Sequence, residues 1–169
     1  ISDEYLEVEI KKEDGSIEIY EIEKEFDEDL GIVFENPTID PIKQCRNKCI
    51  FCFVDQLPAN MRKTLYVKDD DFRLSFLQGN FITFTNLTER DIDKIIQYKL
   101  SPIHVSIHTT DPELRTKMLQ NKTAGNILTQ LKKLSAAGIQ MNGQIVLCPN
   151  INDKEHLEQT IRDLSDLYP

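Results

Sequence analysis

The chain has 169 residues with 20 basic and 29 acidic side chains, so its formal charge is −9, and an apolar fraction of 40% is enough to build a core. This length suits one domain with an appendage, and no apolar run approaches the roughly 20 residues of a membrane helix. The sequence starts at Ile1 and not at methionine, and it contains no recognisable secretory signal peptide.

The acidic charge is concentrated at the amino-terminal end. Residues 1–44 carry 15 acidic and 4 basic side chains, a net charge of −11, whereas residues 45–169 carry 14 acidic and 16 basic ones, a net charge of +2. An acidic composition argues against a nucleic-acid binder, but here the argument holds only for the first quarter of the chain. We therefore predict an acidic β appendage or connector at 1–44 and a separate region at 45–169.

The first region reads as a small hairpin followed by one more strand. Strands are expected at 6–10, 17–22 and 30–34. Apolar residues alternate with glutamates, which is the pattern of a half-exposed strand, and Asp14-Gly15 is a turn signal. The alternation shifts phase at Tyr20, which indicates a bulge or a second exposed apolar face. Solvated charges that protect a sheet edge explain the glutamates most simply, with recognition of a basic partner as the alternative.

The second region alternates strands and helices. Strands are expected near 39–42 and at 81–84, 103–108 and 145–147, and helices are expected to begin at Thr88, Asp111, Ile127 and Asn152. This alternation is typical of βαβ units with a parallel sheet. We predict an α/β fold, a partial (β/α) barrel with about four parallel strands, preceded by the acidic hairpin.

Local signals mark several helix starts. Thr88 precedes a capping-box-like stretch, Asp111 precedes a proline, and Asn152-Asp153 is expected to cap the last helix. The three acids at 69–71 point in different directions in any regular structure, so we interpret them as a helix cap and not as a metal site. Asp111 and Arg115, four residues apart, are interpreted as an ordinary helix-stabilising pair.

Ligands of parallel α/β proteins bind at the carboxyl ends of the strands. The segments that follow the expected strands are Thr85-Asn86, His108–Thr110 and Cys148–Asn150. Three further cysteines, Cys45, Cys49 and Cys52, lie within eight residues of one another. They cannot form a disulfide framework among themselves, and we interpret them as metal ligands. A closed zinc site needs four ligands, whereas three thiolates on a four-iron cluster leave one iron open.

The spacing CxxxCxxC, with the aromatic Phe51 directly before the last cysteine, resembles the motif of the radical S-adenosylmethionine (SAM) enzymes. The stretches CIFCFVDQLP, HVSIHTTDPELR and QIVLCPNIND look like a bacterial group of Fe–S oxidoreductases in which a PDZ-like segment precedes the radical SAM domain. The resemblance covers residues 45–169 and implies a radical SAM barrel. Residues 1–44 would be the connector that follows the PDZ-like segment.

The resemblance implies a role for each matching position. Cys45, Cys49 and Cys52 would hold a [4Fe–4S] cluster whose fourth iron chelates the amino and carboxylate groups of SAM. An electron from the reduced cluster would cleave the S–C5′ bond, giving methionine and a 5′-deoxyadenosyl radical that takes hydrogen from a substrate. Phe51 would pack against the adenine.

The resemblance is incomplete after the second strand, where the family has a GGE element that binds the methionine amino group. Here Asn86 stands between Thr85 and Leu87, and its side-chain carbonyl would accept the same hydrogen bonds. His108 and Gln144 end the third and fourth strands, near the positions of ribose and carboxylate contacts in the family. A structural strand-end histidine and a solvent-facing glutamine are the alternatives.

Cys148 ends a strand and has three interpretations: a hydrogen-atom donor in catalysis, a ligand to a second centre, or a small buried residue. We expect it on the cluster side of the sheet. The alternative to a radical SAM enzyme is a non-catalytic protein that binds an Fe–S cluster or zinc through cysteines for electron transfer or scaffolding. That alternative predicts Cys148 as the fourth ligand.

The expected partners are an unidentified substrate and an electron donor such as ferredoxin or flavodoxin. No membrane association is expected. Basic residues within 45–68 would complement a negatively charged cluster, with the steering of nucleic acid as the alternative. An oxygen-sensitive cluster and exposed thiols indicate a reducing compartment, the cytoplasm. Because about four strands make an incomplete barrel with a bare edge, we expect the rest of the barrel to lie outside this chain.

Overall fold

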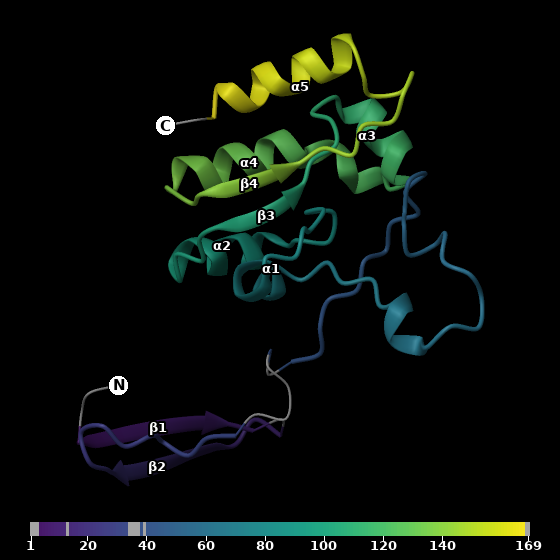
Figure 1. Cartoon of the computed structure of the whole chain (residues 1–169). Helices are drawn as coiled ribbons and strands as arrows, with labels where there is room; N and C mark the ends of the chain where they lie inside the picture. Colours follow the sequence, from purple (N-terminus) through teal and green to yellow (C-terminus); the bar gives the residue numbers. More distant parts are fainter. Residues whose placement is uncertain (1–3, 13, 34–37, 39, 168–169) are drawn as a thin grey trace. The chain divides into compact units, whose positions relative to one another are not determined.

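A computed structural model of the chain describes residues 4–12, 14–33, 38 and 40–167. The chain divides into two compact units, Ile1–Ile39 and Asp40–Pro169. Figure 1 shows the hairpin of the first unit and the helices and short parallel strands of the second. Among the described residues, no helix is both long enough and apolar enough to cross a membrane.

The first unit contains the predicted antiparallel hairpin. β1 (Tyr5–Lys11) and β2 (Ile17–Glu23) pair without a break along their whole length. The register contains no bulge, so the phase shift at Tyr20 reflects a second apolar face, on which Ile17 and Ile19 lie exposed. The strand expected at 30–34 is wrong for residues 30–33, where Gly31 adopts a φ of 66° that interrupts an extended chain, and Phe34 lies outside the described residues.

The second unit is built on a small parallel sheet. β3 (Ile103–Ser106) pairs with β4 (Met141–Gln144) in parallel, and Ile82 adds one parallel bridge to Val105 of β3. The mixed α/β class with a parallel sheet is therefore confirmed. The full strand expected at 81–84 is reduced to the Ile82 bridge, because Phe84 adopts a φ of 63° and ends the extended chain.

Two other expected strands differ from the structure. Residues 145–147 lie beyond β4, because the Gln144 carbonyl accepts from the N–H groups of both Ile107 and His108 and the ladder ends there. No regular strand is assigned to 40–42, and Ile39 lies outside the described residues. The nearby segment instead makes an isolated antiparallel bridge between Gln44 and Asp69.

The helices of the second unit follow the predicted starts closely. They are α1 (Phe72–Gln78), α2 (Glu89–Gln97), α3 (Pro112–Leu119), α4 (Ile127–Ala136) and α5 (Glu155–Ser165), with 3-10 turns η1 (Lys63–Tyr66) and η2 (Lys122–Asn126). Thr88 and Asp91 form a capping box at α2, and the Asp111 carboxylate accepts from Leu114 N–H at α3. Gly138, with a φ of 76°, follows the end of α4 as predicted.

The three successive acids at 69–71 have separate partners, as expected. Asp71 caps α1 by accepting from Arg73 N–H, Asp70 accepts from Thr83 N–H, and Asp69 accepts from the Asn80 amide. They therefore do not converge on one ion.

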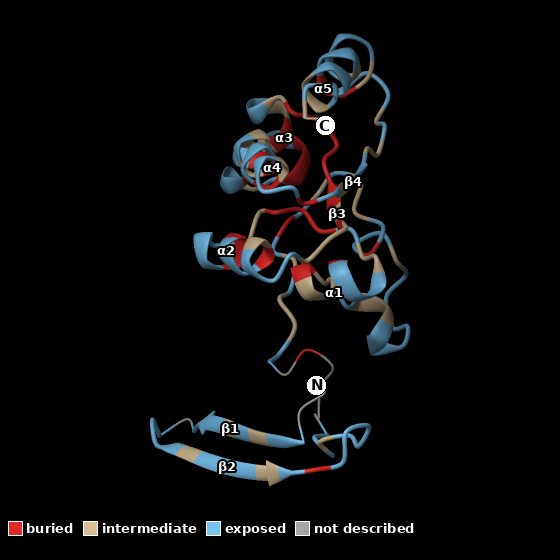
Figure 2. Ribbon diagram, turned by 90° about the vertical axis from the view of Figure 1, so that its left-hand side faces the viewer, coloured by how far each residue is buried: buried red, intermediate tan, exposed pale blue. Residues whose placement is uncertain are grey.

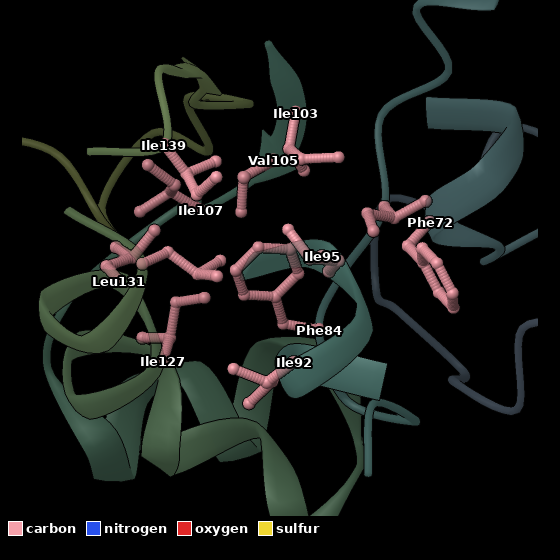
Figure 3. Packing of buried hydrophobic residues seen from close by; sticks show 12 residues of the cluster. Phe72, Phe84, Ile92, Ile95, Ile103, Val105, Ile107, Ile127, Leu131 and Ile139 are labelled. Atoms are coloured by element: carbon pink, nitrogen blue, oxygen red, sulfur yellow. The ribbon is translucent and has the colours of Figure 1, made fainter. Parts of the chain in front are cut away.

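The hydrophobic core lies between β3 and the helices α2 and α4. Figure 3 shows side chains from β3, α2 and α4 meeting around the ring of Phe84. The buried residues of the second unit gather on β3 and on the helix faces turned toward it, whereas the hairpin is mostly exposed (Figure 2). Gly143 of β4 leaves room for this core, because a Cβ there would lie 2.6 Å from Ile107 Cδ1.

Candidate metal centre at the cysteine loop

The three clustered cysteines lie on a loop, residues 45–52, which we call the cysteine loop. Its backbone is held at both ends: Cys45 N–H donates to the Lys68 carbonyl at 2.7 Å, and the N–H groups of Lys48 and Ile50 donate to the last two carbonyls of α3 at 3.1 and 3.0 Å. Carbonyls at the end of a helix have no partner within it. The cysteine loop therefore completes the hydrogen bonding of α3, and α3 in turn shapes the loop.

The thiols of Cys45 and Cys52 lie close enough to Cys49 to affect its pKa. The pKa of Cys49 is raised to about 12, first because the thiol is buried and second because the thiols of Cys45 and Cys52 lie nearby. Burial also raises the pKa of Cys45. Crowded, half-buried thiols resist ionisation, and a bound metal removes that cost by ligating the thiolates. Within the described part of the chain, no three His, Cys, Asp or Glu side chains are arranged to hold a single ion.

A lysine lies beside the thiols. Lys68 Nζ donates to the Asn47 carbonyl of the cysteine loop at 3.0 Å and pairs with Asp55 at 2.8 Å. Burial lowers the pKa of Lys68, but the bond with Asp55 and the nearby Cys52 outweigh burial and raise the pKa overall. The Lys68 charge also favours ionised Cys45 and Cys49. This cation is suited to a site whose ligands are anionic.

Asn86 follows the strand-like segment at Ile82 and lies next to the start of the cysteine loop. Its Nδ2 donates to the Gln44 carbonyl at 3.4 Å, whereas its Oδ1 is buried without a hydrogen-bond partner. A buried carbonyl without a partner costs free energy unless a ligand or water donates to it. Phe84, two residues earlier, is a bulky residue in the left-handed region, a strained conformation that clusters at binding sites.

Phe51 and His108 form an aromatic pair beside the cysteines. Their ring centroids are 4.5 Å apart with an interplanar angle of 58°. His108 Nδ1 accepts from Val146 N–H at 3.2 Å, and burial together with the nearby Arg115 charge lowers the His108 pKa to about 3. The imidazole is thus neutral at pH 7 and carries its proton on Nε2 as a donor. The hydrogen bond from Val146 gives Nδ1 a structural role, whereas the N–H at Nε2 is available to donate to a ligand.

Gln144 and Cys148 differ in their surroundings. Gln144 is exposed, and its backbone carbonyl supports His108. Cys148 packs, together with Cys49 and Phe51, against the small apolar cluster of Met118, Leu119 and Ala124. Cys148 therefore lies on the cysteine-loop side. Its thiol pKa is raised by burial, and no charge of another cysteine contributes.

Asn152 has a role that its position in the sequence did not suggest. The expected cap of α5 is wrong: Lys154 occupies the N-cap position. The Asn152 side chain instead accepts from Cys148 N–H at 2.7 Å and donates to the carbonyls of His108 and Val146 at 2.8 and 3.0 Å. It fixes the segment after β4 against the end of β3.

Arg115 is the largest departure from the sequence interpretation. The expected pair with Asp111 is wrong, because the Arg115 guanidinium is 1% exposed and donates to four backbone carbonyls at 2.7–2.9 Å. These carbonyls belong to Thr83, Ser106, Ile107 and Ala124. Burial lowers its pKa to about 10, which still leaves it charged at pH 7. Buried arginine was not predictable from an i, i+4 spacing, which is common on exposed helices.

The donors of this region fit an iron–sulfur cluster and SAM in their chemistry. Soft thiolates select iron–sulfur clusters or zinc, and a cluster binds each thiolate to a different iron, so its ligands need not meet at one point. The unpartnered Asn86 oxygen suits an ammonium group, and the Phe51–His108 pair offers an aromatic face with a neighbouring N–H donor.

A family model described as the radical SAM-like domain matches residues 24–169. Neither a curated protein nor a solved structure matches the chain significantly. The matched range includes most of the chain and all of the cysteine loop, so the chain belongs to the radical SAM-like domain family.

Proposed function

We propose that this chain carries the cluster- and SAM-binding part of a radical SAM enzyme whose substrate is not identified. The observation that carries the proposal is a loop on which the Cys45 and Cys52 thiols help to raise the pKa of Cys49, next to a buried carbonyl of Asn86 that has no hydrogen-bond partner. Cys45, Cys49 and Cys52 would hold a [4Fe–4S] cluster. When reduced, such a cluster supplies the electron that splits SAM into methionine and a 5′-deoxyadenosyl radical.

The residues of this chain would bind, orient and shield the cofactor. Asn86 Oδ1 would accept from the SAM ammonium group, because that oxygen is buried and has no other donor. Phe51 would contact the adenine, and His108 would donate from Nε2, since its Nδ1 is already used. Gln144 would contact a polar group at the end of β4. Lys68 would offset the negative charge of the ligated thiolates.

The reaction would depend on an external electron donor and on reducing conditions. Each turnover needs one electron from outside this chain, for which a ferredoxin or flavodoxin is the proposed donor. Thiolate ligands and an oxygen-sensitive cluster require reducing conditions, so we place the protein in the cytoplasm.

Anaerobic reconstitution of the chain with iron and sulfide tests this function. We expect about four irons and about four sulfides per chain, and 5′-deoxyadenosine with methionine after addition of dithionite and SAM. Cys49→Ala is expected to abolish both cluster and products. Arg162→Met, at an exposed arginine of α5, is the matched control and should leave them unchanged. A wild-type chain that binds no iron would refute the proposal.

The second candidate is a non-catalytic protein in which Cys148 is the fourth ligand of an Fe–S cluster or zinc. It is favoured by one observation: Cys148 and Cys49 border the same apolar cluster. Against it, the Cys148 thiol does not contribute to the raised pKa of Cys49, whereas Cys45 and Cys52 do. Cys148→Ser separates the two candidates, because only the second predicts that this change destroys metal binding.

A further inference from the structure

Asn47, in the middle of the cysteine loop, has a role that the motif does not require. Its side chain is 2% exposed and has three partners far along the chain. Nδ2 donates to Thr83 Oγ1 at 2.9 Å, and Oδ1 accepts from Thr85 Oγ1 at 3.0 Å and from Asn121 Nδ2 at 2.6 Å. An amide buried so deeply with both ends bonded has a single favourable position.

The partners of Asn47 belong to two other parts of the fold. Thr83 and Thr85 follow the Ile82 bridge to β3, and Asn121 is the N-cap of η2 after α3. Thr83 is itself held by the buried Asp70 carboxyl group, 1% exposed, through its N–H and its hydroxyl. The Asn47 amide thus connects the cysteine loop to the sheet end and to the α3–α4 connection at once.

The backbone of the segment from Cys45 to Asn47 is held by Lys68. The Asn47 carbonyl accepts from Lys68 Nζ at 3.0 Å, and Cys45 N–H donates to the Lys68 carbonyl at 2.7 Å. Nearby charge and solvent exposure are among the factors that set the reduction potential of an iron–sulfur cluster. Fixing the Asn47 side chain therefore also fixes the loop backbone next to the Lys68 charge.

We propose that Asn47 is the positioning residue of the cysteine loop, holding the segment from Cys45 to Cys49 in place in the metal-free chain through the three hydrogen bonds of its side chain. The consequence for a bound cluster rests on the proposed function. The expected effect on the metal-free chain is independent of the proposed function, because it concerns only the accessibility of the thiols.

The first test measures how fast iodoacetamide alkylates each cysteine of the metal-free chain, read by peptide mass spectrometry. Asn47→Ala is expected to raise the rates at Cys45 and Cys49 roughly tenfold, because losing buried hydrogen bonds increases local opening by about that factor. Cys148 serves as an internal control and should keep its rate. All four rates should stay unchanged in Asn126→Ala, at an exposed asparagine that makes no side-chain cap for α4.

Two results of this test would overturn the proposal. Unchanged rates at Cys45 and Cys49 would show that Asn47 does not hold the loop, and an equal rise at Cys148 would show that it only stabilises the fold.

A smaller change keeps the test usable if Asn47→Ala folds poorly. Thr85→Val removes the hydroxyl that donates to Asn47 Oδ1 and should open the loop, whereas Thr85→Ser keeps a hydroxyl and should not.

The second test uses the reconstituted chain and compares the reduction potential and the EPR spectrum of the cluster. Asn47→Ala and Thr85→Val are expected to shift both, and Thr85→Ser is expected to retain the wild-type values. A wild-type chain that takes up no iron refutes the proposed function and leaves the alkylation result standing. A wild-type chain that loads normally, with an identical potential and spectrum in Asn47→Ala, overturns the positioning role alone.

Discussion

Replacing Arg115 by methionine tests whether one buried guanidinium joins the carboxyl ends of the sheet segments. Methionine keeps an apolar stem but leaves the four carbonyls that accept from Arg115 without this donor. At about 1 kcal/mol for each buried carbonyl, the loss amounts to about 4 kcal/mol. The variant no longer has to bury a charge, which offsets part of this loss of stability. We therefore expect the free energy of unfolding to fall by about 3 kcal/mol.

Urea unfolding followed by circular dichroism measures this loss as a lower midpoint at an unchanged slope. Arg115→Lys should recover part of the stability, because an ammonium group keeps the charge and three donors but not the planar fork. Arg162→Met is the control: this arginine of α5 is exposed and forms a solvent-exposed ion pair with Glu158, so its effect should stay within about 0.5 kcal/mol. A loss below about 1 kcal/mol in Arg115→Met would refute the reasoning.

Three further predictions concern the same unit. Burial raises the pKa of Asp70, so the folded chain binds this proton more tightly than the unfolded chain does. Wild type should therefore lose stability relative to Asp70→Asn as pH rises from 3.8 through that raised pKa, and a pH-independent difference between their urea midpoints would contradict this. The pKa of His108 is lowered to about 3 in the folded chain, so wild type should lose stability relative to His108→Gln as pH falls from 6.5 toward 3. A difference in unfolding free energy between the two proteins that does not change with pH would contradict this prediction. Gly143→Ala should lower the free energy of unfolding by about 1–3 kcal/mol, because the new Cβ meets Ile107; an unchanged thermal midpoint would show that the core yields.

The helices were predictable because their signals are local. Thr88 and Asp111 cap the helices that follow them, and the apolar spacing of α2 and α4 predicted their buried faces. The cysteine spacing likewise predicted a shared site, since three thiols within eight residues stay near one another in any compact fold. These features depend on neighbours in the sequence.

The polar supports of the site were not predictable in this way. Asn47, Arg115 and Asn152 make their bonds to residues that lie far away in the sequence or to backbone carbonyls, and neither kind of partner leaves a periodic signal. The strand bounds failed for a related reason: Phe84 turns into the left-handed region, which its side chain gives no cause to expect. Tertiary hydrogen bonds, not local propensity, decide these positions.

The most direct test of the central claim is electron–nuclear double resonance on the reduced, reconstituted chain with SAM carrying ¹⁵N in its amino group. The account predicts a ¹⁵N coupling to the cluster, which weakens in Asn86→Leu because this change removes the buried oxygen that we propose as the acceptor for the ammonium group. A fully loaded and reduced cluster that shows no coupling to labelled SAM would contradict the account.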